Sequence, residues 1–85
     1  MKVIVDDKIP YIREALTALV DEPIFLPATK IDKAAVKDAD ALIVRTRTLC
    51  NEDLLKGSKV QFIATATIGY DHIDRAYLAS RGVKF

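Results

Sequence analysis

Residues 64–74, with the sequence ATATIGYDHID, combine small side chains, hydroxyl groups and one glycine in a way that suits anion binding. Small side chains let backbone amides approach a ligand closely, and Gly69 permits a positive φ or tight packing. A helix that begins just after it would present its amino terminus to an anion. The alternative is an ordinary turn between a strand and a helix, with an aspartate that caps the helix.

A second candidate is the sequence Arg-Thr-Arg-Thr at residues 45–48. Two guanidinium groups beside threonine hydroxyls suit a phosphate or a carboxylate. Strand alternation would point Arg45 and Arg47 to the same side, unless a turn already begins at Arg45. The alternative is a solvated strand end in which an arginine pairs with Asp6 or Asp7.

Other groups could do chemistry, but each has a plainer interpretation. Asp6 and Asp7 could bind Mg²⁺, although an ion pair with Arg45 or simple solvation is favoured. His72 is the single histidine and could act as a general base, although a surface or capping position at a helix start is favoured. Cys50 adjoins a predicted helix start, which can lower a thiol pKa. Because no histidine is near it in sequence, we expect an ordinary semi-buried cysteine.

Composition excludes several classes of protein. The 85 residues carry 13 basic and 12 acidic side chains, a net charge of +1, which argues against nucleic-acid or membrane-surface partners. A single cysteine excludes an internal disulfide and fits a reducing cytosol. No apolar run is long enough to span a membrane. The three glycines form neither a P-loop nor G-x-G-x-x-G, so a nucleotide cofactor would be bound outside this chain.

Short apolar runs alternate with helical patterns, which predicts an α/β fold with a doubly wound parallel sheet. The expected strands are residues 3–5, 24–26, 41–44, 60–64 and 83–85. Because the last of these runs has no helix after it, we interpret the chain as a fragment. In such a sheet, ligands bind beyond the carboxyl ends of the strands. If all strands are parallel, this rule brings together Asp6, Asp7, Pro27, residues 45–47 and residues 65–71.

Capping residues mark the expected helices. Pro10 suits the first turn of the first helix, whose apolar stripe follows at positions 12, 16, 19 and 20. The remaining starts and stops, in chain order, are Asp32, then Asn51 with Gly57, then Asp71 or Asp74 with Gly82.

The same sequence resembles a known family, the D-isomer-specific 2-hydroxyacid dehydrogenases, over essentially all 85 residues. The resemblance rests on VIVD at 3–6, IPY at 9–11, DADALIVR at 38–45 and FIATATIGYDHID at 62–74. The Thr-Ala-Thr sequence before the glycine, and the opening aspartate followed by Ile-Pro-Tyr, are more specific to the branch that acts on erythronate 4-phosphate.

The resemblance implies a two-domain, cytoplasmic, homodimeric enzyme that oxidises a small phosphorylated hydroxy acid. Residues 1–85 would form the amino-terminal part of a flavodoxin-like substrate (catalytic) domain. A Rossmann domain absent from this chain would bind NAD. The histidine, glutamate and arginine that the family uses in catalysis belong to segments beyond Phe85, so no catalytic residue is carried over, and His72 does not match that histidine.

Substrate contacts do carry over from the resemblance. Thr46 matches the serine or threonine that follows the arginine after the third strand, and Thr67 matches the last threonine of the Thr-Ala-Thr loop. Arg45 adjoins Thr46, and we assign it to the anionic groups of the substrate.

Two other classes of function fit parts of the sequence. A receiver-like signalling domain would suit the opening Val5-Asp6-Asp7, but it needs a phosphoacceptor aspartate where the third strand here ends in Val44-Arg45-Thr46. A small-molecule binding module without catalysis is the other alternative for the isolated chain.

Overall fold

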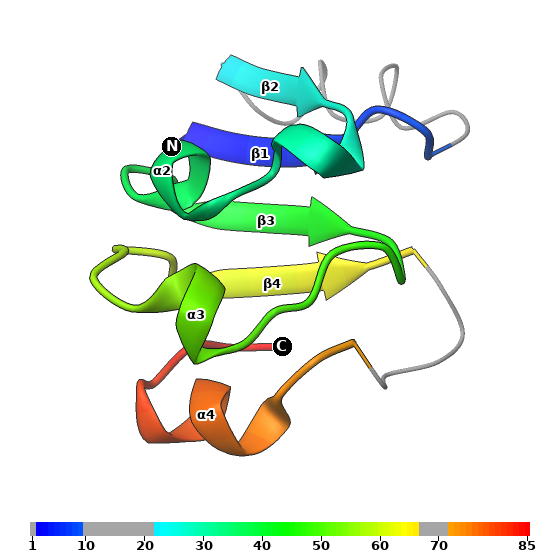
Figure 1. Ribbon diagram of the computed structural model, residues 1–85. Helices are drawn as coiled ribbons and strands as arrows, with labels where there is room; N and C mark the ends of the chain where they lie inside the picture. Colours follow the sequence, from blue (N-terminus) through cyan, green and yellow to red (C-terminus); the bar gives the residue numbers. More distant parts are fainter. Residues whose placement is uncertain (1, 10–21, 67–71) are drawn as a thin grey trace.

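A parallel four-stranded sheet forms the centre of the protein in a computed structural model, which describes residues 2–9, 22–66 and 72–85 (Figure 1). The strands lie in the order β2-β1-β3-β4, and every pairing is parallel. Their bounds are β1 Lys2–Asp6, β2 Glu22–Leu26, β3 Ala41–Val44 and β4 Phe62–Thr65. The helices are a 3-10 turn η1 Ala28–Lys30, α2 Lys33–Val36, α3 Glu52–Leu55 and α4 Arg75–Ser80. The predicted α/β class and parallel sheet are confirmed.

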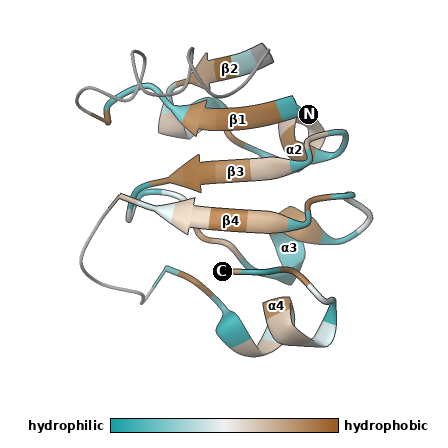
Figure 2. Cartoon of the chain, turned by 180° about the vertical axis from the view of Figure 1, so that it is seen from behind, coloured by the Kyte–Doolittle hydropathy of each residue, from teal (hydrophilic) through white to brown (hydrophobic). Residues whose placement is uncertain are grey.

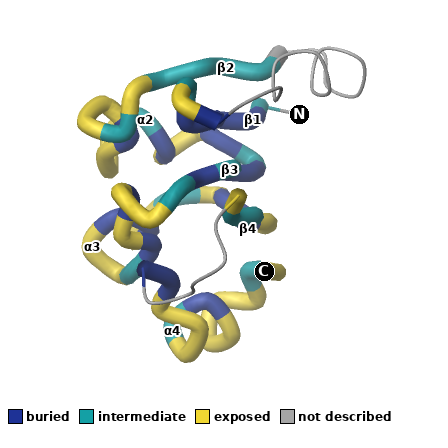
Figure 3. Tube along the Cα trace, turned by 90° about the vertical axis from the view of Figure 1, so that its right-hand side faces the viewer, coloured by how far each residue is buried: buried dark blue, intermediate teal, exposed yellow. Residues whose placement is uncertain are grey.

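One face of the sheet packs against α2 and α3, which lie together on that side in Figure 3. Successive side chains of a strand point to opposite faces, so every second residue contributes to one side. Register places Ile24, Ile4, Leu42 and Ile63 in one row across all four strands. The last three of these are almost fully buried, in a cluster with Val36 of α2, Leu54 and Leu55 of α3 and Leu78 of α4.

The opposite face carries a second, smaller apolar cluster. Its buried members are Val3, Val5, Ile9 and Ala41. Apolar residues therefore point both ways from β1 and β3, as the continuous apolar runs of these strands predict. Figure 2 shows how much of these strands is hydrophobic, as brown colour along β1 and β3.

The predicted fifth strand is not formed as a strand. Lys84 makes one isolated parallel bridge with Phe62, in which its N–H donates to Gln61 O at 2.9 Å and its C=O accepts from Ile63 N at 2.8 Å. The preceding residue still belongs to the end of α4, because Val83 N donates to Leu78 O at 2.9 Å. The chain thus occupies the expected position beside β4, but through a single bridge.

Three predicted helix starts are capped as their sequences indicate. Asp32 accepts from Ala35 N at 2.9 Å, Asn51 from Leu54 N at 3.2 Å, and Asp74 from Tyr77 N at 3.0 Å. Of the two predicted starts for the last helix, Asp74 is the one observed.

Glycines end two of these helices, as predicted. Gly57 and Gly82 have φ of 81° and 70°, the left-handed conformation that ends a helix at low cost only for glycine. The helix predicted from Pro10 lies outside the described residues.

Candidate functional site

All four strands deliver their carboxyl ends to one edge of the sheet, and their arrowheads point the same way in Figure 1. Backbone hydrogen bonds continue the pairing just past the strands. Asp7 N donates to Leu26 O at 2.9 Å, and Ala66 N donates to Val44 O at 3.0 Å. The residues that follow the strands are therefore held side by side, as the sequence predicted for a parallel sheet.

Arg45 and Asp6 form an ion pair across neighbouring strands at this edge. Arg45 Nε lies 3.0 Å from Asp6 Oδ2, and the Asp6 side chain is fully buried whereas that of Arg45 is 28% exposed. The N–H of Arg45 does not aim at that oxygen, so the contact is electrostatic and not a directed hydrogen bond. The other Asp6 oxygen accepts from Lys8 N at 2.9 Å. The predicted pairing of an arginine with Asp6 is thus observed, and Asp6 orients the side chain of Arg45.

A hollow of about 360 Å³ opens beside this ion pair. Its lining comes from the ends of three strands: Lys8 after β1, Pro27, Ala28 and Thr29 after β2, and Arg45 and Arg47 after β3. Every charged residue of the lining is a cation. Such a surface attracts an anion.

The segment after β3 turns at once. Thr48 N donates to Arg45 O at 3.2 Å, so the turn starts at Arg45 and strand alternation does not continue through it. Thr46 and Arg47 are exposed at the tip of this turn. Thr48, the last residue of the predicted Arg-Thr-Arg-Thr candidate, is buried, and its hydroxyl has no hydrogen-bond partner within the described part of the chain.

The loop after β3 (the β3 loop, residues 45–51) is joined to residues 72–74. These residues follow the loop after β4 (the β4 loop, residues 66–71). Cys50 N donates to His72 O at 2.8 Å, and Asp74 N donates to Cys50 O at 2.9 Å. His72 Nε2 lies 3.0 Å from Thr65 Oγ1, at the end of β4. These contacts hold residues 72–74 against both the β3 loop and the end of β4.

His72 is buried, 5% exposed, and the expectation of a surface or capping position is wrong. Its backbone pairing with Cys50 draws it inward, a long-range contact that its local sequence does not indicate. Cys50 is likewise fully buried and not semi-buried, because its strand-like bridge to Ile73 places it in the core. Burial raises the pKa of the Cys50 thiol to about 12, so the neighbouring helix start does not activate it.

Two predicted features of the β4 loop, Thr67 and Gly69, lie outside the described residues. In the described ranges, no group of three or more His, Cys, Asp or Glu side chains is arranged to hold a metal ion. Asp6 is paired with Arg45, while one Asp7 carboxylate oxygen is buried and has no hydrogen-bond partner among the described residues. No helix within those ranges has the length and apolarity to cross a membrane.

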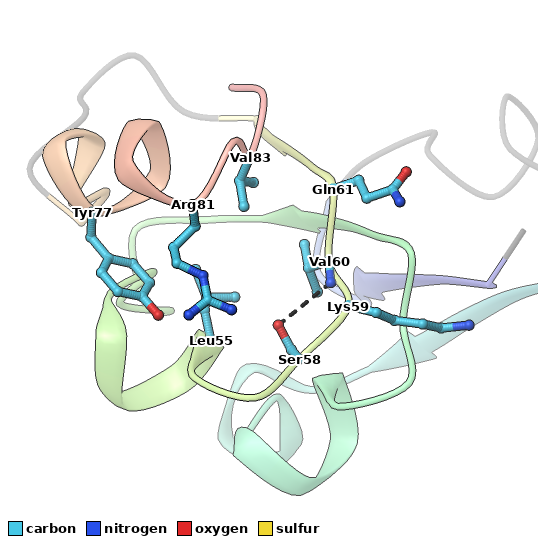
Figure 4. Close-up of a pocket in the computed structure, with 8 residues that line it drawn as sticks. All are labelled: Leu55, Ser58, Lys59, Val60, Gln61, Tyr77, Arg81 and Val83. Carbon is cyan, nitrogen blue, oxygen red and sulfur yellow. Dashed lines mark hydrogen bonds between the residues drawn. The ribbon is translucent and has the colours of Figure 1, made fainter.

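A different pocket, of about 230 Å³, lies near the amino-terminal edge of the sheet (Figure 4). Residues 58–61 lead into β4 along one side, and Tyr77, Arg81 and Val83 border the other. Ser58 Oγ accepts from Val60 N at 3.5 Å, which is a turn contact. None of the side chains that the sequence singled out lines this pocket, so the carboxyl edge remains the candidate site.

The sequence matches the family described as D-isomer specific 2-hydroxyacid dehydrogenase, catalytic domain, over residues 3–85. The chain belongs to this family. Solved structures agree with a 2-hydroxyacid dehydrogenase fold. One of them is a putative D-isomer specific 2-hydroxyacid dehydrogenase, NAD-binding, from Polaromonas. It aligns with 96% of this chain, at a TM-score of 0.73 and 26% identity. The PH0520 protein from Pyrococcus horikoshii shares the fold with a TM-score of 0.83, at 23% identity over 99% of the chain.

Two curated relatives of this 2-hydroxyacid dehydrogenase chain carry the same name. An erythronate-4-phosphate dehydrogenase from Bacteroides thetaiotaomicron is 58% identical over 85 residues, all of this chain but 24% of the relative. The protein of that name from Teredinibacter turnerae is 48% identical over 85 residues, 23% of its length. The chain thus spans about a quarter of the length of these relatives.

Membership of this family also decides against a receiver-like domain. Strand order alone does not, because receiver domains share the β2-β1-β3-β4 arrangement. The position after β3 that a receiver needs for its phosphoacceptor aspartate holds Arg45, which is bound to Asp6.

Proposed function

We propose that the protein carrying this chain is an NAD-dependent erythronate-4-phosphate dehydrogenase of pyridoxine biosynthesis. It would oxidise 4-phospho-D-erythronate at the 2-hydroxyl to 2-oxo-3-hydroxy-4-phosphobutanoate. The observation that carries the proposal is the 58% identity, over all 85 residues, to a relative of that name. A cytoplasmic homodimer is part of the same proposal.

This chain would supply part of the substrate pocket and no catalytic group. Thr46 and Thr67 would offer hydroxyls to substrate oxygens, and Arg45 would face an anionic group of the substrate. The contacts of Cys50 with His72 and Asp74 support a shared site, because they hold the β3 loop beside the segment that leads out of the β4 loop.

NAD would be bound by a domain outside these residues. The residues present do not fit a dinucleotide: the three glycines are isolated, and Gly57 and Gly82 each follow a helix end. No glycine-rich turn therefore exists here to approach a pyrophosphate. The role of the chain is to bind and orient the substrate, which keeps its 2-hydroxyl in a fixed geometry for oxidation.

The proposal is tested in the full-length protein with Thr46→Val and Thr67→Val. Each change keeps the shape of the side chain but removes its hydroxyl. If a substrate oxygen loses its partner, binding weakens by about 1–3 kcal/mol. Steady-state kinetics with 4-phospho-D-erythronate and NAD should show this as a raised KM.

Ser80→Ala is the matched control, because Ser80 is an exposed hydroxyl on α4 that donates to Tyr77 O. Its KM should equal that of the wild type. Unchanged kcat and KM in both threonine variants would remove them from the site. Failure of the wild-type protein to reduce NAD with this substrate would reject the proposed function itself.

A further inference from the structure

The hollow between the ends of β1, β2 and β3 is lined by more cations than nearby carboxylates neutralise within the described residues. Of its three cations, Arg45 is balanced by Asp6. Lys8 and Arg47 are exposed, and neither forms an ion pair with a carboxylate within the described ranges. Asp7 precedes Lys8 in the chain but does not line the hollow. An excess of positive charge therefore remains over a small concave surface.

The position of the hollow relates it to the proposed substrate site. It lies on the β1–β2 side of Arg45, whereas the end of β4 lies on the other side, because β3 is between β1 and β4 in the sheet. A ligand that extends across Arg45 would thus place one end near the end of β4. Its other end would reach Lys8 and Arg47.

We propose that Lys8 and Arg47 form a subsite for the phosphate group of a phosphate monoester, beside the Arg45 guanidinium that Asp6 holds in place. This inference rests on the proposed function, because the phosphate monoester is taken to be the 4-phosphate group of 4-phospho-D-erythronate. Phosphate suits the subsite because it carries nearly two negative charges and three acceptor oxygens. A carboxylate has one charge and two oxygens, and would leave part of the positive charge unbalanced.

The test compares Lys8→Gln and Arg47→Gln with the wild-type full-length protein on 4-phospho-D-erythronate and on D-erythronate. Loss of one charge-assisted contact should lower kcat/KM for the phosphorylated substrate by about tenfold or more. The value for D-erythronate should change by less than about twofold, since it has no phosphate to lose contact with. The inhibition constant of inorganic phosphate should rise with the same two substitutions.

Lys37→Gln and Arg81→Gln are matched controls, because these exposed cations lie outside the hollow. They should leave both substrates unaffected. Equal losses on the phosphorylated and unphosphorylated substrates would overturn the subsite, since the cations would then not distinguish phosphate. Wild-type kinetics in both variants would overturn it as well.

A direct binding measurement separates this inference from the proposed function. If the wild-type protein oxidises neither compound, the function fails, and titration calorimetry with inorganic phosphate decides the subsite. Affinity reduced by about fivefold or more in Lys8→Gln and Arg47→Gln, but not in the controls, would support it. Equal phosphate affinity in all five proteins would reject it.

Discussion

At the residue scale, Cys50 shows how tertiary burial determines reactivity. Its side chain is fully buried, its Sγ lies 3.8 Å from Thr48 O, and desolvation raises its pKa to about 12. Only the thiolate reacts as a nucleophile, and very little thiolate exists near neutral pH when the pKa is so high. Cys50 is therefore a core residue, which links the β3 loop to residues 72–74, and not a reactive thiol.

Cys50 should resist thiol reagents while the protein is folded. At about pH 8, reaction with a disulfide reagent should be far slower in the native chain than in denaturant, where the thiol regains its ordinary pKa. Absorbance of the released thiolate measures both rates. Rapid labelling of the native chain would show that Cys50 is accessible.

The raised pKa of the Cys50 thiol also predicts how the free energy of unfolding changes with pH. Because folding raises the thiol pKa, the stabilising effect is complete below the unfolded value of about 9 and declines as pH rises toward about 12. The free energy of unfolding should fall over that range. Cys50→Ala should remove this part of the slope.

At the scale of elements, α2 and α3 are single helical turns whose starts depend on side-chain caps. Asp32 and Asn51 each accept a hydrogen bond from the backbone three residues on. A helix this short has little stability of its own, so its cap and its buried side chains determine its position. Asn51 also follows Cys50 directly. Its cap therefore helps to hold Cys50 where its backbone bonds to His72 and Asp74.

Asn51→Ala should lower the free energy of unfolding by about 1 kcal/mol, because Leu54 N–H would lose its acceptor. Asn51→Asp is the control: it keeps a capping oxygen and should change stability little. Urea denaturation of all three proteins, followed by circular dichroism, gives the comparison. Equal midpoints for the alanine and aspartate variants would mean that the cap does not stabilise α3.

At the scale of the whole molecule, our proposal gives this chain a sheet edge that binds the substrate and leaves the catalytic groups to other parts of the protein. Its carboxyl edge presents Arg45 and Thr46, while the cofactor would be bound elsewhere. An 85-residue chain also buries a modest share of its surface, so its stability alone is small.

The isolated chain should not reduce NAD in the presence of 4-phospho-D-erythronate, since positioning alone cannot replace the absent acid–base and cofactor groups. Absorbance at the NADH band measures the reaction, with the full-length protein as the positive control. Turnover by the isolated chain would refute the assignment of catalysis to other residues.

Local features of the sequence determined most of the architecture. Continuous β-branched runs predicted the four strands that form, and Asp32, Asn51, Gly57 and Gly82 predicted helix starts and stops that are observed. These features act through neighbours within a few residues, so the sequence expresses them directly. The resemblance stated from motifs such as DADALIVR likewise agrees with the family match over residues 3–85.

Only the tertiary structure decided which distant groups meet. The sequence left Arg45 to pair with Asp6 or Asp7, and the structure joins it to Asp6. It favoured a surface or capping position for His72, whereas pairing with Cys50 buries it. It grouped Pro27 with residues 45–47, but only the structure adds Lys8, Ala28 and Thr29 to the hollow that these residues line. Each of these outcomes depends on segments that are adjacent in the fold but far apart in the chain, and local sequence carries no record of that adjacency.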